Sequence, residues 1–267
     1  MHFSDIAIFH DAARLYTGVD YSGAGLLAEC AKHNVIGLVA MGLTETVRYG
    51  FPDNAAVSPM GCDLPGAPGF LKVCLGINPL KIDLNVLEAA LPGAAGLKIY
   101  AGYYHYHVHD PVYAPVYKLA ARYRKPVVIH TGDTYSERGI LEYSHPLQAD
   151  RLAVMNRDVN FILAHMGDPW ILDACEVAYK NDNIFLDMSG LVVGEANEVY
   201  RVKNEPLLRD RFKQGLVLLN RYEKIVYGTD WPLVAMEPYI DLCKALVPET
   251  HWPAVFYDNA AKLFGFA

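Results

Sequence analysis

The stretch Pro126-Val127-Val128-Ile129-His130-Thr131-Gly132 decides the fold that this sequence predicts. It begins with an apolar, mostly β-branched run, which is typical of a strand buried on both faces of a parallel sheet. A histidine follows at the point where the strand ends. Polar residues at the carboxyl ends of parallel strands line the active-site face of (β/α)8 barrels. The stretch therefore predicts a buried strand that delivers His130 to a functional site.

The same pattern recurs in three later stretches. Each is an apolar run that leads into a polar residue: Phe161–Ala164 before His165, Ile184–Leu186 before Asp187, and Ile225–Thr229 before Asp230. Imidazoles and carboxylates that meet at one mouth can bind a divalent metal and take a proton from water. Structural alternatives remain, because a histidine can bond a backbone carbonyl and Asp230 can cap a helix before Pro232. Asp187 is better explained as a structural or supporting residue.

Eight candidate strands can be counted along the chain, and helical patterns separate most of them. They are Ile6–Phe9, Ile36–Met41, Leu71–Ile77, Gly96–Tyr100, Pro126–His130, Asn160–Ala164, Ile184–Asp187 and Ile225–Gly228. Strands that alternate with helices at steps of roughly 30 residues are typical of a parallel α/β fold. A count of eight in 267 residues favours a single closed (β/α)8 TIM barrel. No linker, low-complexity tract or charge block divides residues 1–267, so one domain is predicted.

Composition excludes several classes of function. A net charge of −7 argues against nucleic acid or an anionic membrane as a partner. The sequence has no run of about 18 apolar residues and no secretory signal at its start. Its five cysteines are odd in number and lack CxxC spacing, as in reduced proteins. We therefore expect a cytoplasmic protein that acts on a small molecule; a homodimer is compatible with the sequence.

Three further features have two interpretations each. His10 follows the first candidate strand and is either a ligand or a structural residue. The tract Tyr103–His109 places histidines at every second position, which would align them in an extended segment, but an aromatic loop at the barrel mouth is the favoured interpretation. Lys98 lies inside a buried strand pattern, so it is expected to form an ion pair or to face a carboxylate in the mouth.

Five motifs, taken in order, resemble one known family. Gly96–Tyr100, Pro126–Gly132, Leu163–Gly167, Tyr227–Pro232 and Asn259–Gly265 look like the amidohydrolase-related (amidohydrolase family 2) barrels. That group includes lactone hydrolases and non-oxidative decarboxylases such as aminocarboxymuconate-semialdehyde decarboxylase. The resemblance extends from about Gly96 to the C-terminus. It implies that His130 is a metal ligand, that His165 lies beside the metal-bound water or substrate, and that Asp230 is a ligand and the general base.

The sequence departs from that family at its first strand, where the family carries His-x-His. Here the stretch Ile8-Phe9-His10-Asp11-Ala12 offers one histidine. A set of His10, His130 and Asp230 would still supply three protein ligands, as catalytic zinc sites often do. We therefore expect one divalent metal ion, with zinc the expected ion and manganese the alternative.

The predicted activity is hydrolysis of an amide or lactone bond in a small molecule by a metal-activated water. Asp230 and His165 are the predicted catalytic residues. The predicted substrate contacts are Lys98, Tyr100 and Trp231, which lie in the motifs above. Two alternatives stay open: a non-oxidative decarboxylase of a small carboxylic acid, and a barrel that has lost its metal and only binds ligand.

Overall fold

A computed structural model describes residues 7–42 and 70–266 of the chain. In this part of the chain, seven parallel strands form a sheet in which each strand pairs with the next one along the sequence. The strands are β1 (Leu38–Met41), β2 (Leu71–Ile77), β3 (Gly96–Ile99), β4 (Val127–Ile129), β5 (Phe161–Leu163), β6 (Ile184–Asp187) and β7 (Ile225–Val226). Sequential parallel pairing is the strand order of an α/β barrel.

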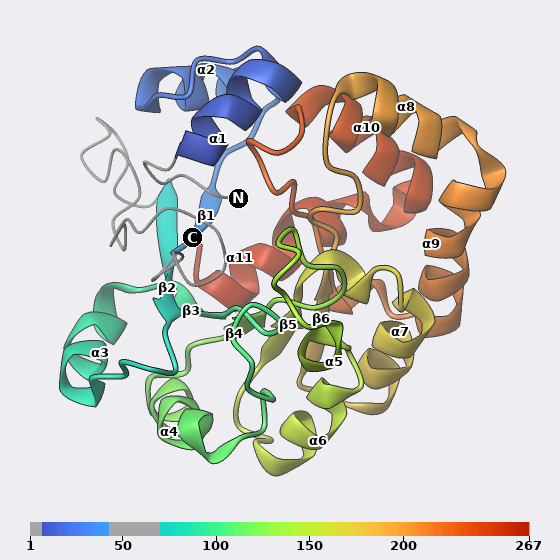
Figure 1. The fold of residues 1–267 in the computed structure, drawn as a ribbon. Coiled ribbons are helices and arrows are strands. Elements are labelled where there is room, and N and C mark those ends of the chain that lie inside the picture. The colour runs from blue at the N-terminus through green and yellow to red at the C-terminus, as the bar shows by residue number, and fades with distance from the viewer. Residues whose placement is uncertain (1–6, 43–69, 267) are drawn as a thin grey trace.

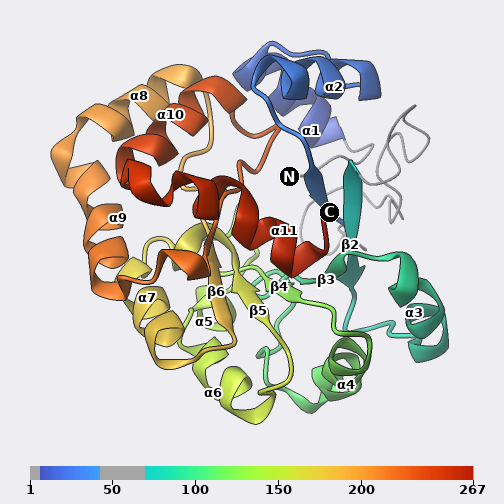
Figure 2. The ribbon, with the colours of Figure 1, turned by 180° about the vertical axis from the view of Figure 1, so that it is seen from behind.

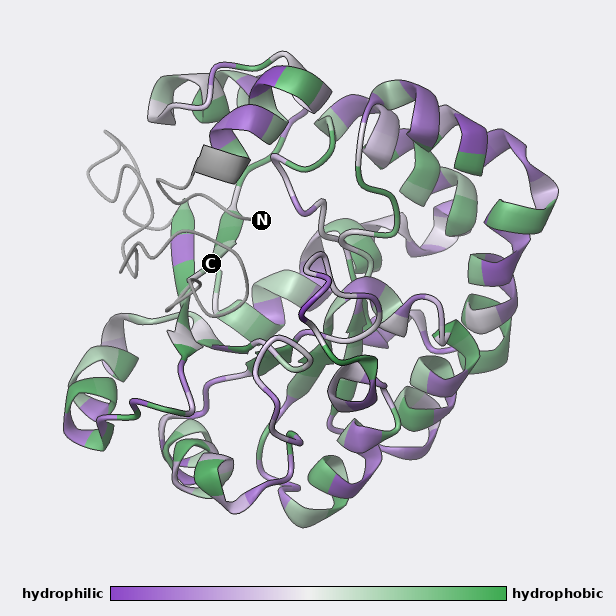
Figure 3. Ribbon diagram, viewed as in Figure 1, coloured by the Kyte–Doolittle hydropathy of each residue, from purple (hydrophilic) through white to green (hydrophobic). Residues whose placement is uncertain are grey.

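Helices surround this curved sheet (Figures 1 and 2). They are α1 (Ala7–Ala12), α2 (Gly23–Lys32), α3 (Leu84–Ala90), α4 (Ala114–Tyr123), α5 (Leu141–Ser144), α6 (Gln148–Met155), α7 (Ile171–Lys180), α8 (Ala196–Asn204), α9 (Pro206–Leu219), α10 (Met236–Leu246) and α11 (Asn259–Phe264). None of the described helices is long and apolar enough to cross a membrane. The outer helices carry hydrophilic and hydrophobic residues together (Figure 3), as expected for helices with one face on a core.

Apolar side chains of the central strands and the outer helices form the main core. Ile99 of β3, Ile129 of β4 and Phe161 of β5 are almost completely buried there. Phe212 of α9 and Val116 of α4 belong to the same cluster. Strands with apolar residues on both faces are what a sheet covered by helices requires.

The register of the sheet brings the carboxyl ends of neighbouring strands to one edge. Ile129 of β4 pairs with Leu163 of β5, and Leu163 pairs with Leu186 of β6. Polar residues follow each of these positions within two residues. His130 and Asp187 therefore leave the sheet at the same edge, which is the edge where barrel enzymes place their chemistry.

The predicted strand over Ile6–Phe9 is wrong for its described part, because residues 7–12 form helix α1. Phe9, Ala12 and Ala13 are buried, and this spacing of three and four residues belongs to a helix face. A four-residue apolar run does not by itself distinguish a strand from a helix. The other seven predicted strands are confirmed, with bounds that differ by two residues or fewer.

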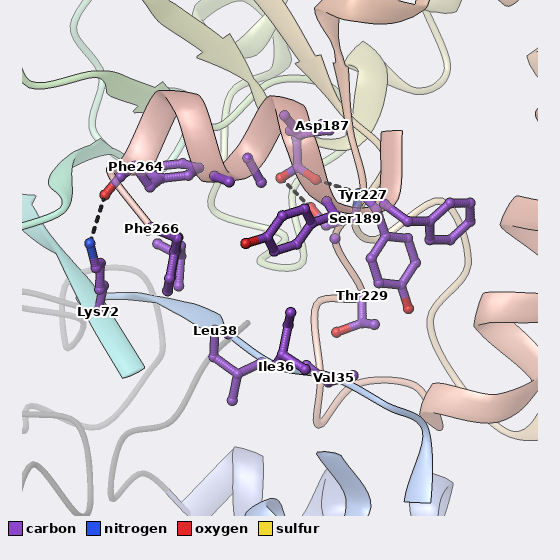
Figure 4. Close-up of a pocket in the computed structure, with 18 of the residues that line it drawn as sticks. Val35, Ile36, Leu38, Lys72, Asp187, Ser189, Tyr227, Thr229, Phe264 and Phe266 are labelled. Atoms are coloured by element: carbon purple, nitrogen blue, oxygen red, sulfur yellow. Dashed lines mark hydrogen bonds between the residues drawn. The ribbon is translucent and has the colours of Figure 1, made fainter. Parts of the chain in front are cut away.

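The sheet is a seven-stranded half-barrel whose edges are β1 and β7. A cavity of about 750 Å³ lies between these edge strands and the C-terminal helix α11 (Figure 4). Leu38 of β1, Val226 of β7 and Phe264 of α11 line it. Asp187 and Ser189 reach it from the end of β6. Closure by an eighth strand, which the sequence predicted, is not part of the described structure.

Candidate active site

Two histidine rings meet at the carboxyl edge of the sheet. His130 directly follows β4, and His165 lies in the 3-10 turn Ala164–Gly167 after β5. The Nε2 atom of His165 is 3.2 Å from the Nδ1 atom of His130, and the ring planes are inclined at 63°. The structure thus brings together the two histidines that the strand pattern singled out.

Each ring uses its outer nitrogen to donate to a backbone carbonyl. The Nε2 atom of His130 is 2.8 Å from the carbonyl oxygen of Asp133, and the Nδ1 atom of His165 is 2.9 Å from that of Ser189. A carbonyl only accepts, so both outer nitrogens carry the proton. In two neutral rings the inner nitrogens then face each other with their lone pairs, and this arrangement favours a cation near both.

The environment keeps His130 neutral. Burial lowers the pKa of His130 well below its ordinary value, and the charges of His165 and Lys98 lower that pKa further. A neutral imidazole that donates its other N–H to a carbonyl is the form in which histidine binds metal.

Asp230 approaches His165 across a glycine. Its Oδ2 atom lies 3.2 Å from the position that a Cβ atom would occupy at Gly190, and the same Cβ would collide with the Nδ1 atom of His165. Only a residue without a side chain fits between these two groups. Asp230 is itself buried, with 8% of its surface exposed, and its carboxylate lies close to the Nδ1 side of His165.

Asp187 does not face the histidines directly but holds the chain that follows β6. Its Oδ1 atom accepts a bond from the Ser189 amide at 2.8 Å, and its Oδ2 atom accepts one from the Ser189 hydroxyl at 2.7 Å. The Ser189 carbonyl in turn accepts from His165. These contacts agree with a supporting role for Asp187.

The backbone at this edge adopts unusual conformations. His165, Met166 and Asp230 have φ angles of 63°, 48° and 69°, in the left-handed region that non-glycine residues rarely occupy. Such conformations cost about 1–3 kcal/mol each and tend to cluster at functional sites. Two of these three residues, His165 and Asp230, are the predicted catalytic residues.

The three predicted substrate contacts lie in different surroundings. Lys98 is buried, and its Nζ atom lies 5.2 Å from the centre of the Tyr100 ring. Burial lowers the pKa of Lys98 to about 8, while Asp230 and Asp187 favour the charged form. The Tyr100 hydroxyl donates to the carbonyl of Gly42 at 3.0 Å. Trp231 is completely buried. That these residues contact a substrate stays a prediction.

His10 lies on helix α1 with an exposed side chain, and its ring packs edge-on against Tyr21 at 4.8 Å. The Tyr21 ring packs in turn on Trp231 at 5.3 Å. Within residues 7–42 and 70–266, no group of three or more His, Cys, Asp or Glu side chains converges as a metal site would. The roles of His10 and Asp230 as ligands therefore stay predictions.

The histidine pair nevertheless fits the two-nitrogen part of a divalent-metal site. Nitrogens bound to one tetrahedral zinc ion at about 2.0–2.1 Å are separated by about 3.3 Å. The observed separation of His130 Nδ1 and His165 Nε2 is 3.2 Å. Both outer N–H groups are fixed by carbonyls, as in known metal sites. The donor chemistry suits zinc or manganese.

The tract Tyr103–His109 forms a loop beside the site. The Tyr103 ring packs against His130 with centres 4.9 Å apart, and the Tyr103 hydroxyl accepts a bond from the Tyr135 amide. His107 and His109 stack on each other farther along the loop. The favoured interpretation of this tract as an aromatic loop at the mouth agrees with these contacts.

Sequence reasoning missed Ser189, Gly190 and the carbonyl of Asp133. A usable signal existed for the first two, because a serine and a glycine follow the strand-ending Asp187 within three residues. The role of Asp133 is carried by its backbone, so its side-chain identity gives no signal.

The fold and this site define a class: an α/β barrel-type protein with histidines and carboxylates at the carboxyl ends of its strands. Residues 69–266 match the amidohydrolase family. The chain belongs to that family. No curated protein matches the chain.

Solved structures with the same fold are similar over most of their length. An uncharacterised TIM-barrel protein from Bordetella bronchiseptica has a TM-score of 0.73 and 19% identity, covering 97% of this chain and 90% of that one. A probable 2-pyrone-4,6-dicarboxylic acid hydrolase from Acinetobacter baumannii has a TM-score of 0.64 and 15% identity, covering 92% and 90%. A 5-carboxyvanillate decarboxylase from Sphingomonas paucimobilis has a TM-score of 0.62 and 17% identity, covering 90% and 82%.

Proposed function

We propose that this protein is a metal-dependent hydrolase that cleaves an amide or lactone bond of a small molecule in the cytoplasm. The observation that carries the proposal is the facing pair of His130 Nδ1 and His165 Nε2, each on a ring whose other nitrogen is fixed by a carbonyl. Two facing lone pairs in a partly buried site repel each other unless a shared cation or proton lies between them. Family membership supports the same reaction class.

The ligands in this proposal are His130, Asp230 and His10. The Nε2 atom of His165, 3.2 Å from His130 Nδ1, faces the same ion and the water beside it. A divalent ion bound there lowers the pKa of a water molecule toward about 7 and polarises a carbonyl. Zinc is the expected ion and manganese the alternative.

The chain's own residues supply the remaining steps. Asp230 accepts the proton that the attacking water loses, since its buried carboxylate lies close to His165. His165 keeps its proton on Nδ1, so its Nε2 lone pair accepts a hydrogen bond from the attacking water and orients it. Lys98, Tyr100 and Trp231 hold the substrate, with the Lys98 ammonium as the group that recognises negative charge.

A second candidate is a non-oxidative decarboxylase of a small carboxylic acid. The buried Lys98 favours it, because an ammonium of pKa about 8 is mostly charged at pH 7 and can pair with a substrate carboxylate. The structurally similar proteins include one named as a hydrolase of a dicarboxylic acid and one named as a decarboxylase. Both names describe carboxylated substrates, so both candidates share that substrate class.

A third candidate is a barrel that only binds its ligand. It would follow if the wild-type protein stays free of metal even after incubation with zinc or manganese. The role of His10, exposed on α1, is a separate question. If His10 is structural, His10→Ala leaves metal content unchanged and costs only about 1 kcal/mol in stability. If His10 is a ligand, the same variant loses most of its metal.

The deciding experiment incubates the purified protein with zinc or manganese and a panel of small lactones, amides and aromatic carboxylic acids. Ring opening or amide cleavage without gas release supports the hydrolase. Release of CO2 with a product one carboxyl group smaller supports the decarboxylase. Saturable binding without turnover across the whole panel contradicts both enzymes and leaves the binding protein.

A further inference from the structure

We infer that Asp187 is a positioning residue that fixes the tautomer of His165 through the hydroxyl of Ser189. The inference rests on the proposed function only in assuming that the inner nitrogen of His165, Nε2, takes part in the reaction. Asp187 itself lies one hydrogen-bonded residue away from that ring.

The direction of each hydrogen bond follows from the groups involved. A Ser189 hydroxyl has one hydrogen, and the carboxylate of Asp187 accepts it at 2.7 Å. The Ser189 oxygen therefore presents lone pairs to the Nδ1 atom of His165, which is 3.3 Å away. The Ser189 carbonyl also accepts from that nitrogen at 2.9 Å. Two acceptors hold the proton on Nδ1, so the Nε2 lone pair faces His130.

The hydrogen bonds from Asp187 through Ser189 to His165 are closely packed on both sides, so their geometry is fixed by the fold. A Cβ atom at Gly228 would collide with Asp187 Oδ1 and would lie 2.9 Å from the Ser189 Cβ atom. A Cβ atom at Gly190 would collide with His165 Nδ1. Gly228 thus leaves room for the Asp187 carboxylate, and Gly190 leaves room for the His165 imidazole. Asp187 is buried, which strengthens its bonds to Ser189.

The substitution Asp187→Asn tests the direction of the hydrogen bond between Ser189 and His165. The amide nitrogen of asparagine would donate to the Ser189 oxygen and free the hydroxyl hydrogen to point at His165 Nδ1. The Ser189 carbonyl would still accept from Nδ1, so the preference for the tautomer protonated on Nδ1 should weaken. We expect the ratio of the two tautomers to change by about tenfold, which corresponds to one hydrogen bond of ordinary net strength.

The measurement is the pair of ring ¹⁵N chemical shifts of His165 in the full-length protein, treated with a chelator and held at pH 8.5. A His165→Gln variant assigns the signals. The wild type should carry the proton on Nδ1. A wild-type ring protonated on Nε2 overturns the inference even if Asp187→Asn does not fold.

The double variant Asp187→Asn/Ser189→Ala separates positioning from folding. It removes the hydroxyl that would donate to Nδ1 but keeps the Ser189 carbonyl, so the preference for the Nδ1-protonated tautomer should be restored. Asp182→Asn, an exposed change just before β6, is the matched control and should leave the His165 shifts unchanged. If Asp187→Asn keeps the wild-type tautomer ratio, or the double variant does not shift the ratio back toward Nδ1, Asp187 is only structural.

The test needs no substrate and no metal, so it fails independently of the proposed function. Absence of turnover would contradict the hydrolase and leave the tautomer result intact. Conversely, an active enzyme whose His165 tautomer ignores Asp187 would contradict only this inference.

Discussion

Two buried lysines, Lys224 and Lys98, distinguish the two ends of this sheet. Lys224, which precedes β7, donates to the carbonyls of Ala178, Asn181 and Ile184 at 2.8, 2.6 and 3.2 Å. Lys98, in β3, lies over the Tyr100 ring, and two carboxylates farther along favour its charge. Burial lowers the pKa of both lysines to about 8. The difference is in what surrounds the ammonium group.

At the amino end of the strands, the Lys224 ammonium donates to three fixed backbone carbonyls, as a buried structural charge requires. At the carboxyl end, Lys98 shares its region with Asp187, Asp230 and the histidine pair. Titratable groups with shifted pKa values and left-handed backbone occur together there. The sheet therefore holds a fully bonded structural charge at its amino end and gathers titratable groups at its carboxyl end.

The largest expected effect comes from exchanging the two lysines in turn for methionine. Lys224→Met leaves three buried carbonyls without their donor, so the free energy of unfolding should fall by about 3 kcal/mol. Lys98→Met should change it by less than about 1 kcal/mol, because methionine fills a site that disfavours charge. Urea unfolding of both variants measures this. Equal losses would show that the two ends do not differ.

At the carboxyl end of the sheet, a substitution should lower activity and leave stability nearly unchanged. Asp230→Asn keeps the shape of the side chain but removes the proton acceptor, so turnover should fall on the order of 100-fold or more. Folding should be nearly unaffected. The measurement is kcat on a substrate found in the panel above, with Asp182→Asn as control. Near-normal turnover of Asp230→Asn would exclude this residue as the base.

The pH dependence of stability tests the charge of Lys98. Its pKa is about 8 in the folded protein and about 10.4 in an unfolded chain. Between these values the unfolded chain binds more protons, so stability should rise with pH. Lys98 alone should contribute about 1.5 kcal/mol between pH 8 and 9.5.

Lys224 contributes in the same direction, so the comparison is between the wild type and Lys98→Met. The rise in unfolding free energy from pH 8 to 9.5 should be smaller in the variant. A rise of the same size in both proteins would mean that Lys98 titrates at its ordinary pKa.

The smallest expected effect comes from two glycines with nearly the same backbone. Gly190 and Gly18 have φ angles of 63° and 64°, but a Cβ at Gly190 meets His165, whereas one at Gly18 meets nothing within 4 Å. Both alanine variants should lose about 1 kcal/mol of stability from the left-handed backbone, and Gly190→Ala should lose more because its Cβ collides with His165. Only Gly190→Ala should also lose activity, by about tenfold, because it moves His165. Equal activity in the two variants would contradict the packing of this site.

The sequence was informative where an apolar run ends in a polar residue. Four of the seven confirmed strands and the meeting of His130 with His165 followed from that pattern, because parallel strands share a carboxyl edge. It misled at Ile6–Phe9, where a short apolar run allows either a strand or a helix.

The support of the histidines could not be predicted. The carbonyls of Asp133 and Ser189 act through the backbone, whose direction depends on the left-handed turn at His165 and on Gly190. No side-chain pattern encodes where a carbonyl points. The role of Asp187 likewise depends on the direction of one hydroxyl hydrogen.

The metal content of the purified protein tests most directly whether the carboxyl end of the sheet is a catalytic centre. Elemental analysis by mass spectrometry, after incubation with zinc or manganese and removal of excess ion, should find about one divalent ion per chain in the wild type. His130→Ala should retain little of it, because it removes one of the two facing nitrogens. A wild-type protein that stays free of metal under these conditions would contradict the metal-dependent hydrolase.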